Sequence, residues 1–127
     1  MVSRFVFDPS QSGLRKTLKE YQELAIRYVW DAGADGADSG QTWRHVKERL
    51  GAGKSISQSS IINFLNRMVV EGVFSFRDAT KKGGHYKIYF PLMNECEYRK
   101  YLLRTIIESM MRDFPIETRE VIDELQT

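Results

Sequence analysis

The chain has 127 residues, of which 42% are hydrophobic and 28% are charged, with 19 Lys and Arg against 17 Asp and Glu. This is the composition of a single soluble globular domain, and it excludes a disordered chain. A domain of this size buries only about two-thirds of the surface that its unfolded chain exposes, so a large enclosed active site would compete with the core.

Targeting and redox features argue against a membrane-spanning, a secreted and a disulfide- or zinc-stabilised protein. No apolar run approaches the roughly 20 residues of a membrane span, and residues 1–13 lack the apolar stretch and cleavage site of a secretory signal. We therefore expect a cytoplasmic protein with no membrane partner. The single cysteine, Cys96, can form neither an intramolecular disulfide nor the clustered thiolates of a zinc site. We expect no metal and no cofactor.

The charge is unevenly distributed along the chain. Residues 39–91 contain 9 Lys and Arg against 3 Asp and Glu, a net charge of +6, whereas residues 1–38 carry −1 and residues 92–127 carry −3. A basic middle segment between neutral and acidic ends indicates contact with a polyanion. The alternative is a solvated surface that is basic for no functional reason.

Residues 1–17 contain Pro, Gly and several Ser and too few apolar residues to fold alone, so we interpret them as an arm. Thr17 and Glu20 match a capping box, which predicts that the first helix begins at Thr17. Apolar residues then recur at helical spacing over 18–29 and predict a helix that ends near Asp31.

A second, shorter helix is expected over residues 41–50, where Trp43, Val46 and Leu50 share a face. Gly51 stands where the end of a helix favours a left-handed residue. Arg44 and Lys47 lie off the apolar face of this helix, so we expect them to be exposed.

A third helix is expected after Ser57, its predicted N-cap, and it should end at Gly72. Its predicted buried residues are Ile61, Phe64, Leu65 and Met68. The opposite side is nearly uncharged but rich in hydrogen-bonding groups, and it consists of Gln58, Ser59, Ile62, Asn63, Asn66 and Arg67.

Residues 73–78 and 85–90 alternate apolar and polar side chains with a period of two, which predicts a hairpin. Its turn is basic, and Pro91 should end its second strand. Asn94 and Glu97 then repeat the capping-box pattern and predict a helix of about twenty residues that extends to Phe114.

Pro115 should interrupt that helix, and a last short helix is expected over residues 116–125. Together these two helices offer more apolar surface than one packing neighbour needs, which predicts a symmetric homodimer. The alternative is intramolecular packing of the same residues. The expected dimer contacts are Leu103, Ile106, Ile107, Met110, Phe114 and Ile122.

The sequence offers little for catalysis. The two histidines, His45 and His85, are far apart and show no metal-binding spacing. The GAGKS stretch at residues 51–55 lacks the spacing between glycines of a phosphate-binding loop. We therefore expect the protein not to be an enzyme.

Binding of double-stranded DNA is better supported. A helix-loop-helix with short polar side chains at the start of its second helix suits a major groove, where Gln58 and Asn63 can pair with adenine and Arg67 with guanine or phosphate. The serines at this helix start either donate to phosphates or serve only as caps. The further candidate contacts are Arg44, Lys47, Ser57, Ser59, Ser60, Lys81, Lys82, His85 and Lys87.

The stretches SISQSSIINFLNRMVVEGVF and KKGGHYKIYFPLMNECEY resemble the recognition helix and wing of winged-helix transcriptional regulators. The chain is most similar to archaeal members of the penicillinase-repressor family, within the MarR-like superfamily, from about Leu18 to its last helix. The resemblance implies an α+β, mostly helical fold: a winged helix-turn-helix of three helices and a two-stranded wing, followed by C-terminal dimerisation helices.

We therefore divide the chain into the arm at 1–17, a DNA-binding domain at 18–91 and a dimerisation segment at 92–127. The resemblance also implies a repressor that binds a palindromic operator as a homodimer. The positions it gives for base reading are Ser59, Ser60, Asn63 and Arg67, and those for the wing are Lys82, His85 and Lys87. The alternative function is a winged-helix protein-interaction module in a larger assembly, which would more often present an apolar groove than a basic hairpin.

Overall fold

The computed structural model describes residues 6–127, and the chain divides into two compact units between Asn94 and Glu95. The first unit contains η1 (Gly13–Lys16), α1 (Glu20–Ala32), η2 (Gly33–Asp35), α2 (Ser39–Arg49), α3 (Gln58–Val70), β1 (Phe74–Lys81) and β2 (Gly84–Pro91). The second contains α4 (Glu95–Asp113) and α5 (Pro115–Leu125). This mostly helical fold with a two-stranded antiparallel sheet confirms the predicted fold class. None of the helices within residues 6–127 is both long and apolar enough to cross a membrane.

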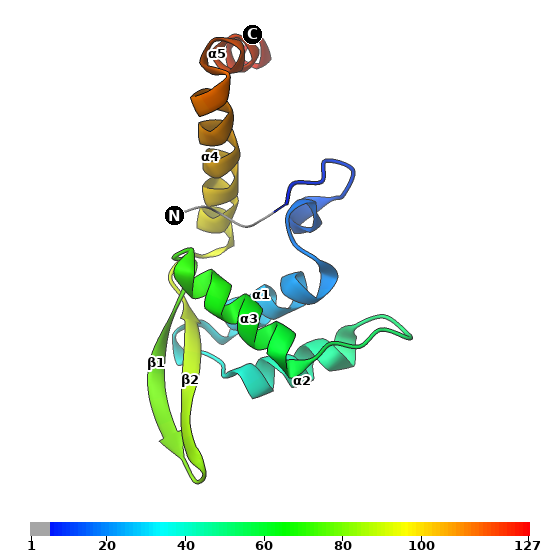
Figure 1. The fold of residues 1–127 in the computed structure, drawn as a ribbon, viewed down its shortest axis with the longest axis vertical. Coiled ribbons are helices and arrows are strands. Elements are labelled where there is room, and N and C mark those ends of the chain that lie inside the picture. Colours follow the sequence, from blue (N-terminus) through cyan, green and yellow to red (C-terminus); the bar gives the residue numbers. More distant parts are fainter. Residues whose placement is uncertain (1–5) are drawn as a thin grey trace. The chain divides into compact units, whose positions relative to one another are not determined.

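The first unit has one hydrophobic core between three helices and the base of a hairpin. In Figure 1, α1, α2 and α3 pack together and the β1–β2 hairpin extends away from them. The four residues predicted to face inward from α3 are all buried. The fully enclosed side chains of this core include Ile26, Val29, Val46, Ile61, Leu65, Met68, Val73 and Phe74.

The first helix begins later than the sequence predicted. Thr17 does not cap it; instead the chain forms the short helix η1, and α1 starts at Glu20 with Lys19 at its N-cap. The backbone N–H of Lys19 donates to Oε1 of Gln22 at 2.9 Å. The glutamine three residues after the cap therefore supplies the acceptor that the sequence analysis assigned to Glu20.

The second helix also ends differently from the prediction. Leu50 is already extended, with φ −64° and ψ 147°, so Gly51 does not adopt the left-handed conformation expected of it. The positive φ in this loop, +77°, occurs at Gly53. The turn between α2 and α3 is thus made two residues further along the chain than predicted.

The third helix agrees with its predicted ends. Ser57 is its N-cap, and Oγ of Ser57 accepts from the backbone N–H of Ser60 at 3.1 Å. At the other end Gly72 has φ +81°, and the N–H groups of Gly72 and Val73 donate to the carbonyls of Val69 and Met68. These two bonds form a Schellman motif, which satisfies carbonyls that the end of a helix leaves unpaired.

The hairpin is longer than predicted and is attached to the helices by a third short segment. Its strands pair from Phe74 opposite Pro91 to Lys81 opposite Gly84. Ala37 pairs with Tyr89 through two backbone hydrogen bonds of 2.8 and 2.9 Å. Next to this pair Gly36 has φ +74°, and a Cβ there would lie 2.6 Å from the carbonyl oxygen of Tyr89. Only glycine therefore allows this close approach of the two backbones.

The second unit is a pair of helices with few buried side chains. α4 begins directly after Asn94, and α5 has Pro115 in its first turn, where the missing N–H of proline is tolerated. Tyr98 and Leu102 are the buried residues of α4, and α5 has none. The apolar side chains of both helices are therefore mostly exposed.

Candidate nucleic-acid interface

The turn between α2 and α3 is fixed by contacts from both sides. Nε1 of Trp43 donates to the carbonyl of Ile56 at 2.9 Å, which attaches the end of the turn to α2. Lys54 in the turn forms an ion pair with Glu20 of α1 at 2.7 Å. These contacts hold the start of α3 in place against the two preceding helices.

The start of α3 presents a small set of polar side chains to solvent. Gln58, Ser59 and Asn63 are exposed. Ser57 is also exposed, but it serves as the N-cap, because its Oγ accepts from the Ser60 amide and lies 2.9 Å from Oγ of the half-buried Ser60. Of these three predicted serines, Ser59 is the one that is exposed and takes no part in this cap.

Arg67 differs from the other predicted base-reading residues. Its Nε donates to Oε2 of Glu71 at 3.0 Å, and its guanidinium lies 5.6 Å from the ring centre of Phe64. The Arg67 side chain is only 20% exposed. The structure therefore does not place Arg67 with the exposed polar group at the start of α3.

Two basic residues of α2 extend the polar surface. Arg44 and Lys47 are both exposed, and Nζ of Lys47 lies 4.5 Å from the ring centre of Trp43. A Cβ built on Gly40 would meet both Nη1 of Arg44 and Nε2 of Gln58 within 4 Å. The side chains of Arg44 and Gln58 thus converge on the first turn of α2.

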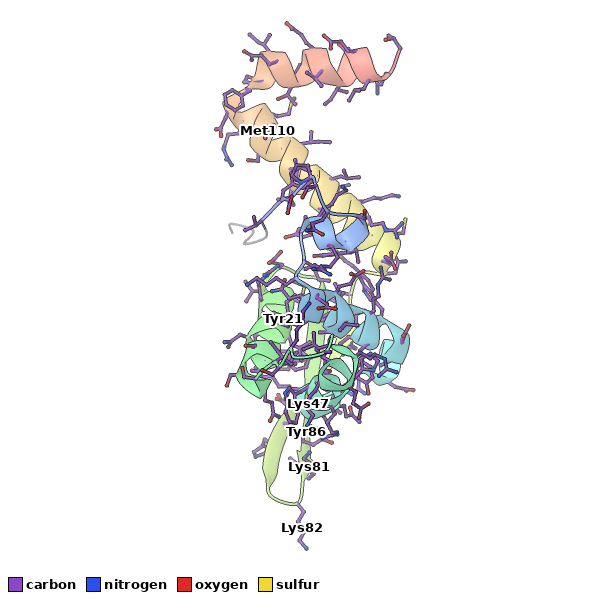
Figure 2. The ribbon with its side chains drawn as sticks, turned by 90° about the vertical axis from the view of Figure 1, so that its right-hand side faces the viewer. Tyr21, Lys47, Lys81, Lys82, Tyr86 and Met110 are labelled. Atoms are coloured by element: carbon purple, nitrogen blue, oxygen red, sulfur yellow. The ribbon has the colours of Figure 1, made fainter. Side chains whose placement is uncertain are left out.

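The tip of the hairpin carries the next basic group. Lys81, Lys82 and His85 are exposed, and Lys82 and Gly83 lie between the strands. Nζ of Lys81 lies 4.6 Å from the ring centre of Tyr86. Figure 2 shows that the Lys82 side chain extends outward from the tip, while Lys81 and Tyr86 lie closer to the helices.

Lys87 is in a different environment from the lysines at the tip. It stands opposite Asp78 in the strand register, and its Nζ lies 4.5 Å from the ring centre of Phe76. Lys87 therefore lies along the strand and not at the tip with Lys81 and Lys82.

The residues that orient the hairpin were not among those predicted from the sequence. Arg77 donates from its two terminal nitrogens to the carbonyls of Ala34 and Asp35, at 3.1 and 2.6 Å. The hydroxyl of Tyr89 donates to Oδ1 of Asn66 on α3 at 2.7 Å, and burial raises the pKa of Tyr89. Asn66 thus anchors the wing, although its position in the sequence placed it among the polar residues of the α3 surface.

The residues predicted to form a dimer lie mostly around one groove. An open groove of about 440 Å³ lies between α4 and α5, and its apolar lining is Ile106, Ile107, Met110, Phe114, Val121, Ile122 and Leu125. Five of the six predicted contacts are among these residues. Leu103 lies outside the groove and is 60% exposed. Val121 and Leu125 belong to the groove but were not in the predicted set.

The histidines are not arranged for catalysis or metal binding. The ring of His45 packs at 4.4 Å from that of Tyr28, and burial lowers the pKa of His45. His85 is exposed on the hairpin. No group of three or more His, Cys, Asp or Glu within residues 6–127 is placed to hold a metal ion.

The sequence comparison agrees with this geometry. Residues 21–126 match the penicillinase repressor family, and this match includes all of α1 except its first residue and the whole of α2, α3, both strands, α4 and α5. No curated protein and no solved structure gives a significant match to the chain.

Proposed function

Because the chain belongs to the penicillinase repressor family, a family of DNA-binding transcriptional repressors, we propose that it represses transcription as a homodimer on a palindromic operator. In this proposal residues 18–91 bind DNA, residues 92–127 form the dimer contact, and residues 1–17 form an accessory arm. α3 occupies the major groove, and the hairpin lies on the backbone or the minor groove.

The exposed polar group at the start of α3 is the observation that best supports the proposal. A helix that enters the major groove reads bases with side chains near its N-terminus. Gln58 and Asn63 carry amides that can pair with both the N6 and N7 groups of adenine. We include Ser59 among the base contacts and leave Arg67 out, because its guanidinium is paired with Glu71.

The exposed basic residues supply the sequence-independent part of DNA binding. Arg44 and Lys47 on α2 and Lys81 and Lys82 on the hairpin are exposed, so each can reach and neutralise a phosphate. The free N–H groups at the start of α3, together with the hydroxyls of Ser57 and Ser60, can also bind a phosphate. His85 adds a donor close to the tip of the hairpin.

The groove between α4 and α5 supports the dimer. Its lining is apolar, and Met110 and Phe114 are 49% and 55% exposed in a single chain. A second copy of this chain would remove both from water, and in a symmetric dimer the same groove would be covered on each partner. Two DNA-binding units would then face two half-sites, which is why we expect a palindromic operator.

The proposal is tested by comparing one base-contact variant with one phosphate-contact variant on two DNAs. The first DNA is a duplex that the protein selects from a randomised library, and the second is a random-sequence duplex. Asn63→Ala should weaken binding to the selected duplex by about 1 to 3 kcal/mol and leave random DNA almost unchanged. Lys82→Ala should weaken both DNAs equally and reduce the salt slope by about one.

Lys100→Ala is the matched control, because Lys100 is an exposed lysine of α4 outside the proposed interface. It should leave both affinities unchanged. Equal loss on both DNAs for Asn63→Ala would contradict the proposed role of α3. Absence of duplex binding at low salt would contradict DNA binding altogether and favour the protein-interaction alternative.

A further inference from the structure

A second cavity lies in the first unit, between the residues that precede and begin α1 and the last turn of α3. Its volume is about 500 Å³, which is within the range of small-molecule sites. Four basic side chains line it, namely Arg15, Lys16, Lys19 and Arg67, and the one acidic residue of its lining is Asp8. The cavity therefore concentrates positive charge in a concave site.

Two nitrogens of this basic group are buried without a hydrogen-bond partner. Among the residues that the structure describes, neither Nε of Arg15 nor Nη2 of Arg67 has an acceptor. A buried donor without a partner is costly, and more so when it belongs to a charged group. An anion beside these guanidinium groups would compensate them in an environment where electrostatic interactions are stronger than in bulk water.

The local contacts show which of the cations remain available. Nζ of Lys16 donates to the carbonyls of Pro9 and Gln11, and Nε of Arg67 donates to Glu71. Arg15 and Lys19 have no ion pair with another residue of the described range 6–127. These two side chains would supply most of the net attraction for a ligand.

Asp8, the acidic residue of the lining, already has hydrogen-bond partners within its own loop. Oδ1 of Asp8 accepts from both the backbone amide and the hydroxyl of Ser10, and these bonds lower the pKa of Asp8. Its carboxylate is exposed and is held by its own loop. Asp8 and the Glu71 that pairs with Arg67 offset two of the four positive charges, and the remaining charge of +2 is more than a monovalent ion would balance.

We propose that this cavity is a binding site for a small polyvalent anion with carboxylate or phosphate groups. Arg15 and Lys19 contact the anion directly, and Arg67 contributes its charge from α3. The site shares no residue with the proposed DNA contacts, because Arg67 lies in this cavity and not with the exposed polar residues at the start of α3. The proposal does not depend on DNA binding.

The test uses the full chain and two probes, inorganic phosphate and citrate, with sodium chloride at matched ionic strength as the reference. A ligand that binds only the folded state raises Tm in proportion to the logarithm of its concentration above Kd. We expect citrate and phosphate to raise Tm more than sodium chloride does. Isothermal titration calorimetry should give a saturable citrate isotherm with one site per chain.

Arg15→Gln should weaken citrate binding at least tenfold, and Lys19→Gln should weaken it by a smaller factor. Arg27→Gln is the matched control, because Arg27 is also a half-buried arginine but lies outside the cavity and pairs with Glu23. It should change citrate binding less than twofold. Lys19 is exposed, so its variant tests the site even if Arg15→Gln does not fold.

Two outcomes would overturn the proposal. One is an equal Tm in citrate, phosphate and sodium chloride. The other is citrate binding that Arg15→Gln and Lys19→Gln leave unchanged. A DNA phosphate could also supply an anion of this kind, so duplex binding by both variants is measured in parallel. We expect it to stay within twofold of the wild type, and a loss confined to duplex binding would contradict a small-molecule site.

Discussion

α3 and α5 are both amphipathic helices, but they use their apolar residues differently. α3 has 13 residues and buries Ile61, Phe64, Leu65 and Met68. α5 has 11 residues and buries none, and Val121 and Leu125 are 50% and 80% exposed. The apolar pattern alone therefore does not tell whether a helix is covered within its own chain or by another one.

The difference follows from the number of neighbours that each helix has. α3 packs against α1, α2 and β1, so its apolar face is enclosed on several sides. α5 packs against α4 within its unit, and the groove between them is open. A helix pair cannot enclose a core by itself, because each helix leaves its far side uncovered. The apolar faces of the second unit are thus left uncovered within that unit, whereas those of the first are enclosed.

The largest expected effect comes from a core substitution in the first unit. Phe64 is 2% exposed, so Phe64→Ala should reduce the free energy of unfolding by about 3 to 5 kcal/mol. Phe114→Ala removes the same atoms from a side chain that is 55% exposed. At a protein concentration where the chain is monomeric, it should cost less than about 1 kcal/mol. Urea unfolding followed by circular dichroism measures both, and equal losses would contradict the comparison.

The second prediction concerns the groove between α4 and α5. Met110→Glu places a carboxylate in the proposed contact, and an unpaired charge there should raise the dimer dissociation constant by about 100-fold, or about 3 kcal/mol. Sedimentation equilibrium measures this change. Glu108→Gln is the control, because Glu108 is exposed and lies outside the groove lining. A wild-type chain that is monomeric at micromolar concentration would refute the dimer itself.

The third prediction tests how the first unit closes around the base of its hairpin. Gly36→Ala introduces a Cβ at 2.6 Å from the Tyr89 carbonyl oxygen and into a backbone with φ +74°. Strain at such a residue costs about 1 to 3 kcal/mol. Gly53→Ala is a matched control, since Gly53 has φ +77° but no neighbouring atom within 4 Å. Thermal unfolding should therefore show a larger loss for Gly36→Ala, and equal losses would mean that only the backbone conformation matters.

The smallest expected effect separates positioning from stability. Tyr89→Phe removes the hydrogen bond to Asn66 and should cost about 1 kcal/mol in unfolding free energy. Because this bond joins the wing to α3, affinity for a selected duplex should fall more than affinity for random DNA. Tyr86→Phe is the control, since no hydrogen bond of the Tyr86 hydroxyl is recorded within residues 6–127. A greater loss for Tyr86→Phe would contradict the positioning role of Tyr89.

The sequence predicted the helices well where residues close together in the chain specify the face or the end of a helix. The period of 3.6 residues gave the buried face of α3, Ser57 and Gly72 gave its ends, and Pro115 separated α4 from α5. It failed where the chain offered two possible helix starts close together. Thr17 and Lys19 both precede a possible helix start, and tertiary contacts select between them by burying Thr17 and Leu18.

The candidate site likewise has features that the sequence specifies and features that only packing specifies. The sequence by itself determined which residues are polar, basic or apolar, and therefore the composition of the α3 surface, the basic hairpin and the apolar C-terminal helices. Only the tertiary structure decided which of these side chains are available. Glu71 pairs with Arg67, Asn66 accepts from Tyr89, and Arg77 donates to backbone carbonyls of η2. The last two contacts each join residues of different elements, so they form only when those elements pack together. The Arg67–Glu71 pair is local in the sequence, but it too depends on how deeply packing buries Arg67. The partners of a side chain are therefore determined by packing and not by its own chemistry alone.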